Sequence, residues 1–365
     1  MIAEKPLHYR SSEYKLSSNQ FKEFHRESTG RSIGAIVIVW AQITAIQLVM
    51  QYVVPPVYFW WTYVPTIFLL AGRQGALMQL IHEGSHNSLS KSKRLNDTLG
   101  KWFCALPIGV SYEGYKAGHL SHHAGVGTEI DPPSDSDKYR VTDFRKPMLY
   151  LLLLKDLVGI SALLVFLDYG RNNTNAKPRN SSGEGGGIWL KSMVSFTQLC
   201  LVQLGLLLVL IQSRMFLGAE ALVFANSVLL DNLIMYVLLW LVPATSPHMF
   251  LMRIRGIAEH GLMRQLGVDE GPRYTRGTDE GLFYTRSFLT PQTSYRFQPL
   301  IWLERLLIGS FNVNYHHEHH LYPRVPWYNL PKLHALVGNK VAERNPDVYA
   351  RGYFSAAMRS VLSSQ

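Results

Sequence analysis

The chain has 365 residues, and its 36 Lys and Arg against 26 Asp and Glu give a formal net charge of +10. Because 47% of the residues are hydrophobic, an intrinsically disordered chain is excluded. The two cysteines, Cys104 and Cys200, form no C-x-x-C motif, which excludes a disulfide scaffold and a zinc ribbon. No cluster of Lys and Arg accompanies a motif that reads DNA or RNA, so we expect no nucleic acid as a partner.

Two long apolar runs in the first quarter of the chain predict a membrane hairpin. Residues 34–54 contain no charged side chain, and a helix of this length crosses about 30 Å of hydrocarbon at about 1.5 Å per residue. Pro55 and Pro56 then break the run, and a second span is predicted at about 57–81. The helical pattern continues to His86, which makes this helix longer than the membrane is thick. We therefore expect its last turns to stand in the aqueous phase.

A second hairpin is predicted farther along the chain, with spans at about 190–212 and 219–242. Residues 148–167 are also apolar, but Lys155 and Asp156 interrupt them, which favours an interfacial or buried helix over a span. Few basic residues lie in the two short turns between paired spans, whereas the opposite side is rich in Lys and Arg. The positive-inside rule therefore places that opposite side in the cytoplasm.

These spans define the expected fold class and domain organisation. We predict an all-α integral membrane protein with four transmembrane helices in two hairpins. A cytoplasmic helical cap is expected from 82–187 and 243–365, and the whole chain, 1–365, is expected to form a single domain.

The placement of the 14 histidines is the most informative feature of the chain. One H-x-x-x-H motif and two H-x-x-H-H motifs hold eight of them: His82 and His86; His119, His122 and His123; and His316, His319 and His320. Residues at i, i+3 and i+4 share one face of a helix, so each motif can aim two or three imidazoles at one point.

Eight convergent imidazoles indicate a metal centre, because neutral imidazole suits iron, zinc and copper. One tetrahedral zinc takes only four ligands, so the number favours a site with two metals. The motifs fall outside the predicted spans, whereas a metal transporter would need its histidines inside them. We do not expect metal binding by the histidines that lie outside the motifs or off their shared face: His8, His25, His248, His317 and His334.

The pattern resembles the membrane-bound fatty acid desaturase and hydroxylase superfamily, and within it the acyl-lipid and sphingolipid desaturase branch. The resemblance covers about residues 34–335 in order: hairpin, H-x-x-x-H, H-x-x-H-H, hairpin, a late His, and the segment NYHHEHH. It implies two irons held by histidines alone, with the eight histidines of the motifs as ligands. It also implies a ninth ligand after the last span, and His260 in RGIAEHG is the candidate.

Three polar residues near the motifs could support the metal ligands. Asn312 and Asn314 precede the last motif and could orient ligands or a metal-bound water, or they could cap a helix instead. Asp131 follows the second motif, where the family often has acidic residues, and it could steady a histidine or only solvate a loop.

The resemblance implies an O2-dependent diiron oxidoreductase that introduces a double bond into a long acyl chain of a lipid. Hydroxylation or ketolation of an acyl, alkane or carotenoid substrate by the same centre stays open, because both reactions share all the residues named. No H-P-G-G haem-binding signature is present, so we expect electrons from a separate donor such as a ferredoxin or a b-type cytochrome. We expect a bacterial inner membrane rather than the endoplasmic reticulum, with the active site facing the cytoplasm.

Overall fold

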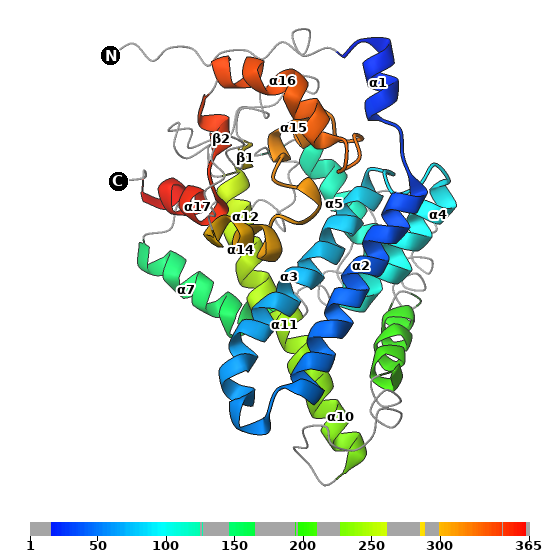
Figure 1. The fold of residues 1–365 in the computed structure, drawn as a ribbon, viewed down its shortest axis with the longest axis vertical. Coiled ribbons are helices and arrows are strands. Elements are labelled where there is room, and N and C mark those ends of the chain that lie inside the picture. Colours follow the sequence, from blue (N-terminus) through cyan, green and yellow to red (C-terminus); the bar gives the residue numbers. More distant parts are fainter. Residues whose placement is uncertain are drawn as a thin grey trace, which may run out of the picture.

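The computed structural model describes residues 16–124, 126, 146–164, 194, 196–209, 227–260, 285–288, 299–344 and 346–362. The described part is mostly helical (Figure 1). Its helices are α1 Ser18–Phe24, α2 Thr29–Leu48, α3 Phe59–Ser85, α4 Lys93–Thr98, α5 Tyr112–Ala124, α7 Lys146–Leu157, α10 Val228–Tyr236, α11 Val242–Thr245, α12 Pro247–His260, α14 Pro299–Leu307, α15 His316–Leu321, α16 Leu330–Arg344 and α17 Tyr353–Leu362. Two short strands, β1 Ser287–Phe288 and β2 Tyr349–Ala350, pair in parallel.

Three helices of the described part are long and apolar enough to cross a membrane: Ser18–Val53, Pro56–Ser85 and Val228–His260. The first covers all but the last residue of the predicted span at 34–54, and the second contains the predicted span at 57–81. Within the predicted span at 190–212 the structure describes a shorter apolar helix, Phe196–Val209. The four-span count therefore stays a prediction, while the apolar helices indicate a membrane protein.

The helix of the last predicted span continues well beyond its expected end at 242. A π-helical turn, Val237–Leu241, and the short α11 connect α10 to α12, so the helical path reaches His260. Pro243 and Pro247 do not interrupt this path, because each lies in the first turn of a new helical segment. Proline is tolerated there because the first N–H groups of a helix have no partner within it. This extension carries His260 to the same end of the molecule as the other motifs.

Helix α3 is the central element. It packs against α2, α5, α11, α12 and α14, and its candidate span is 61% buried, against 28% for the span that contains α2. Arg73 of α3 lies in this apolar surrounding and donates to the Leu306 carbonyl and to Ser310. A buried charge is costly unless protein groups satisfy it. This contact therefore anchors the segment that leads into α15 against α3.

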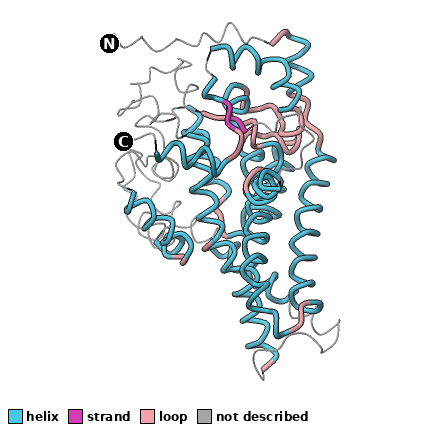
Figure 2. Tube along the Cα trace, turned by 60° about the vertical axis from the view of Figure 1, so that its left-hand side comes forward, coloured by secondary structure: helices cyan, strands magenta, loops and turns pink. Residues whose placement is uncertain are grey.

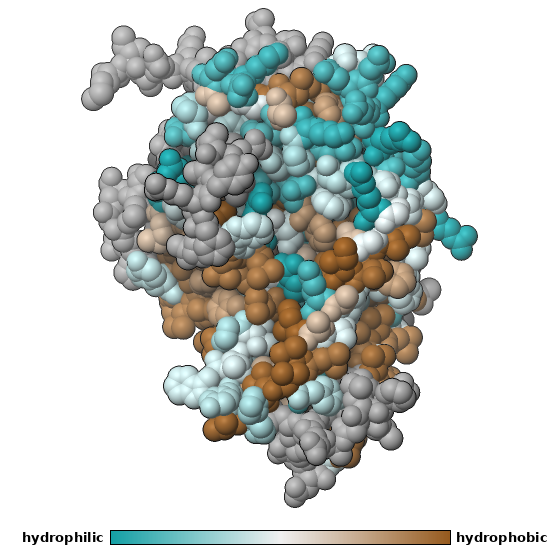
Figure 3. Space-filling model, in the orientation of Figure 1, coloured by the Kyte–Doolittle hydropathy of each residue, from teal (hydrophilic) through white to brown (hydrophobic). Residues whose placement is uncertain are grey.

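The long helices form one end of the molecule and the smaller elements the other (Figure 1). Helices α5, α15 and α16 gather at the upper end, and the strand pair also lies there (Figure 2). The face seen in Figure 3 is hydrophilic over this upper end and mostly hydrophobic over the long helices. The exposed apolar side chains on the long helices include Val37, Ile38, Trp60 and Trp61.

Helix α7 covers part of the run at 148–167 that we expected to be interfacial or buried. It packs against α12, where Asp156, which is fully buried, pairs with Arg253. The charge that interrupts the apolar run is thus satisfied by protein.

Candidate metal centre

Four helices bring the predicted histidines together at the upper end of the bundle. The last turn of α3 carries His82, and His86 follows as its C-cap. Helix α5 carries the second motif and α15 the third, while His260 is the last residue of α12. All nine predicted histidines thus lie in one cluster, although the first and the last are more than 200 positions apart in the chain.

The nine histidines divide into two adjoining groups. In the first group, one ring nitrogen of each residue lies within 4.8 Å of the others: His82, His86, His119, His123 and His319. The second group is made of two overlapping sets that share His260: one is His122, His260 and His320, and the other is Glu259, His260 and His316. Its histidines are therefore His122, His260, His316 and His320. The groups touch, since the rings of His123 and His320 stack with centroids 4.1 Å apart.

Burial keeps six of these imidazoles uncharged. It lowers the pKa of His86 to about 3, with the nearby charges of Lys116 and Arg324 adding to the effect. Burial, together with neighbouring imidazoles, also holds the pKa well below its ordinary value for five others: His119, His123, His316, His319 and His320. Neutral imidazole is the form that binds metals, so these six histidines are in the ligating state at neutral pH.

The spacing of the ring nitrogens fits bound metal ions. Three pairs face each other through Nε2: His86 and His119 at 2.9 Å, His123 and His319 at 3.0 Å, and His260 and His316 at 3.0 Å. Two nitrogens that bind one metal at about 2.1 Å and at right angles would also be about 3.0 Å apart. In addition, Nε2 of His82 is buried without a hydrogen-bond partner in the described part of the chain. The donor set and its orphaned nitrogen therefore fit a metal site.

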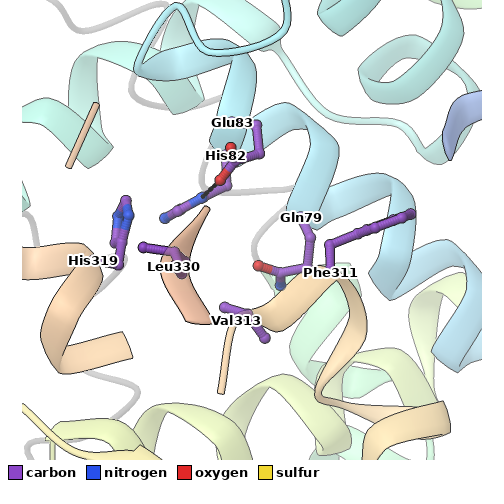
Figure 4. A pocket seen from close by; sticks show the side chains of 7 residues that line it. All are labelled: Gln79, His82, Glu83, Phe311, Val313, His319 and Leu330. Atoms are coloured by element: carbon purple, nitrogen blue, oxygen red, sulfur yellow. Dashed lines mark ion pairs between the residues drawn. The ribbon is translucent and has the colours of Figure 1, made fainter. Parts of the chain in front are cut away.

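Two cavities border the cluster. The larger, of about 90 Å³, is lined by histidines of both groups and by Met78, Tyr115, Met252 and Arg255. The smaller has room for about one water, about 10 Å³, and lies on the side of His82 and His319 that Figure 4 shows. The larger cavity therefore borders histidines of both groups.

The predicted supporting residues contact backbone rather than histidine rings. The side chain of Asn312 donates to the Trp327 carbonyl at 3.1 Å, and that of Asn314 donates to the Phe288 carbonyl at 2.9 Å. Asn312 has a positive φ of 54°, a conformation that Asn tolerates better than most residues. Both therefore shape the turn before α15. Asp131 lies outside the described residues.

The histidines that we did not expect to be ligands lie outside both groups where they are described. His317 contacts Thr285 through Nδ1 at 2.9 Å. His334 contacts Glu318, a fully buried carboxylate that also accepts from Tyr349 and Ser287. This network fastens α15 to α16 and to the strand pair, and the sequence reasoning did not anticipate it.

Two buried acidic residues beside the histidines were also missed. Glu83 follows His82 in the chain, and Glu259 precedes His260. In both HEGSH and AEHG an acidic residue stands directly beside a candidate ligand, and this pattern could have identified both residues from the sequence.

Comparison with known proteins agrees with this geometry. The profile of the fatty acid desaturase family matches residues 58–351. The dihydrorhizobitoxine desaturase of Bradyrhizobium elkanii is 26% identical over 285 residues, which are 76% of this chain and 68% of that protein. Two proteins called sn-1 acyl-lipid omega-3 desaturase (ferredoxin) match over shorter stretches. The one from Nostoc sp. (strain 36) is 37% identical over 23% of this chain and 22% of its own length. The one from Synechocystis sp. (strain ATCC 27184 / PCC 6803 / Kazusa) is 32% identical over 29% of this chain and 30% of its own length.

The matched region contains every element that supplies a histidine to the two groups, from α3 to α15. The relatives are all named as desaturases. The chain therefore belongs to the fatty acid desaturase family, and it is a desaturase, an oxidoreductase enzyme.

Proposed function

We propose that this desaturase uses two irons, O2 and electrons from a separate donor to introduce a double bond into a long acyl chain of a membrane lipid. The observation that carries the proposal is the convergence of nine histidines, eight of them buried and one partly buried, into two adjoining groups. Five would hold one iron and four the other. The overall reaction takes two hydrogens from neighbouring methylenes, one O2, two electrons and two protons, and it releases two waters.

The protein and the metals would have separate tasks. Two irons held there would supply the oxidising power to remove hydrogen from an unactivated methylene, which no side chain can provide. The residues of the larger cavity would hold the acyl chain so that one methylene lies beside both groups. Met78 and Met252 offer apolar, adaptable walls for such a chain. Placement within an ångström or so decides which carbon reacts.

The basic surface beside His86 would favour an acidic one-electron carrier as the electron donor. The charges of Lys116 and Arg324 lie close enough to act on His86, and Arg324 is exposed. Lys91, Lys93 and Arg94, also exposed, follow in the loop and in α4. Opposite charges steer such encounters. The word ferredoxin in the names of two relatives supports a donor of this class.

The membrane arrangement is also part of the proposal. The helix at Phe196–Val209 would belong to a fourth span, and the cap from 82–187 and 243–365 would face the cytoplasm of a bacterial inner membrane. The basic residues on the side of the cap support this orientation, and all three relatives are bacterial. The name acyl-lipid desaturase in two of them supports a lipid substrate. We propose that Asn312, Asn314 and Asp131 support the ligands only indirectly.

Lipid profiling by mass spectrometry, after expression in a host with a ferredoxin supply, tests this function. The wild type should produce a lipid about 2 Da lighter than a host acyl lipid, because desaturation removes two hydrogens. The double variant His319→Ala/His320→Ala should abolish it, since it removes one ligand from each group. His25→Ala is the matched control, because His25 lies outside both groups and on the surface end of α1. A product about 16 Da heavier would mean hydroxylation and would refute the proposal.

A further inference from the structure

Two buried carboxylates stand beside the histidine cluster, one at each group. Glu83 is 4% exposed and Glu259 is 3% exposed. Each is a sequence neighbour of a histidine of the cluster, and each comes from the end of a long helix, α3 or α12. Buried carboxylates are costly unless other groups hold them in place. The burial of these two carboxylates beside the histidines therefore indicates that they have a function there.

Glu83 faces His82 in the first group. Its Oε1 lies 3.5 Å from Nδ1 of His82, the contact that the dashed line marks in Figure 4. Its Oε2 accepts a hydrogen bond of 3.0 Å from the backbone N–H of Trp327. The other ring nitrogen of His82, Nε2, is the buried one without a hydrogen-bond partner in the described residues. His82 thus presents Nδ1 to a carboxylate and leaves Nε2 for the cluster.

Glu259 repeats this arrangement in the second group. Its Oε2 lies 3.6 Å from Nδ1 of His316, while Nε2 of His316 lies 3.0 Å from Nε2 of His260. Its Oε1 accepts from Nε of Arg255 at 2.8 Å. Here too one oxygen is held by the protein and the other is turned to the Nδ1 of a histidine in the cluster.

We infer that Glu83 and Glu259 are positioning residues, each dedicated to one of the two metals. This inference rests on the proposed two-metal site. A neutral imidazole carries one N–H, so a histidine that binds metal through Nε2 carries its hydrogen on Nδ1. The two contacts, at 3.5 and 3.6 Å, are longer than a hydrogen bond. With a metal bound, the carboxylates would accept that hydrogen and fix the tautomer and the ring orientation of His82 and His316. A carboxylate that does so also makes the imidazole a stronger ligand.

The two carboxylates differ in how they are held, and this difference makes the metals inequivalent. A backbone N–H binds Glu83, whereas the guanidinium of Arg255 binds Glu259 and draws on its charge. The imidazole of His82 therefore receives more electron density than that of His316. The two irons should accordingly give separate spectroscopic signals, even though histidines supply both groups.

Mössbauer spectroscopy and chelator competition on the purified, 57Fe-loaded protein test this inference. Glu83→Gln should change the signal of one iron and weaken its binding by about tenfold or more, which is typical of lost support behind a histidine ligand. Glu259→Gln should do the same to the other iron. The matched control is Glu304→Gln: Glu304 is a buried carboxylate that accepts from the backbone N–H groups of Tyr353 and Phe354, away from the histidines. It should change neither signal.

The outcomes separate this inference from the function on which it rests. If the wild type binds two irons and each glutamate variant alters a different one, the inference stands. If the wild type binds two irons but a glutamate variant alters both alike, or neither, the inference is wrong and the two-metal function is untouched. If the wild type does not bind two irons, the two-metal site itself is refuted, and the inference fails with it.

Discussion

Asn96 is predicted to hold the loop that carries His86, and Asn96→Leu should loosen that loop. Asn96 is fully buried at the end of the first turn of α4. Its Oδ1 accepts from the N–H of Leu89 at 3.1 Å, and its Nδ2 donates to the Gly84 carbonyl at 2.9 Å. It therefore ties both flanks of His86 to α4.

The free-energy cost of Asn96→Leu depends on which backbone groups lose their hydrogen-bond partner. The Gly84 carbonyl keeps the hydroxyl of Tyr112, at 2.9 Å, as a donor. The buried N–H of Leu89 loses its acceptor, and an orphaned group of this kind costs about 1–3 kcal/mol. A cost of about 2 kcal/mol raises the population of the open loop roughly 30-fold, since about 1.4 kcal/mol is a factor of ten.

Hydrogen–deuterium exchange of the peptide that spans the loop measures this population directly. We expect the Leu89 amide to exchange roughly 30-fold faster in Asn96→Leu than in the wild type, with weaker iron retention at the first histidine group. Asn232→Leu is the matched control, because Asn232 is equally buried but lies in α10 and donates to the Val228 carbonyl. Unchanged exchange in Asn96→Leu, or equal acceleration in Asn232→Leu, would refute the reasoning.

Three further predictions concern stability in detergent. Tyr349→Phe removes one hydrogen bond of 2.9 Å to the buried carboxylate of Glu318 and should lower the free energy of unfolding by about 1.5–3 kcal/mol. An unchanged Tm in thermal unfolding would show that this bond does not contribute to stability. Gly72→Ala places a Cβ 2.9 Å from backbone atoms of Leu306 and Leu307 and should lower the free energy of unfolding by about 1–3 kcal/mol. In the control Gly34→Ala, the new Cβ meets nothing within 4 Å and should be tolerated. Equal losses of stability in both variants would contradict the packing argument. In the metal-free protein, burial lowers the pKa of His86 from 6.5 to about 3. Between these pH values the unfolded state binds more protons than the folded state, so the free energy of unfolding should fall as the pH drops below about 6.5. A free energy of unfolding that stays constant from about pH 7 to about pH 4 would contradict this prediction.

The grouping of the histidines was predictable from local spacing, but their division between two sites was not. Residues i, i+3 and i+4 share a helix face whatever the fold. Adjacent residues, however, are turned by about 100° from each other on a helix. His122 and His123 therefore join different groups, and so do His319 and His320. Which group each joins depends on how α5 and α15 pack, and spacing along one helix carries no information about that.

Tertiary contacts also explain what the sequence reasoning missed. The pairing of Glu83 with the Trp327 backbone and of Glu318 with His334 joins segments that no local pattern connects. The sequence reasoning also did not predict that the helical path continues past Pro243 and Pro247 to His260. A proline in a first turn costs little, and the packing of α12 against α3 and α17 stabilises the continuation.

Anomalous diffraction at the iron edge, from crystals of the iron-loaded protein, tests the two-metal centre most directly. We predict two peaks: one among His82, His86, His119, His123 and His319, and the other among His122, His260, His316 and His320. A single peak, or iron bound away from both groups in a protein that still desaturates lipid, would contradict the proposed centre.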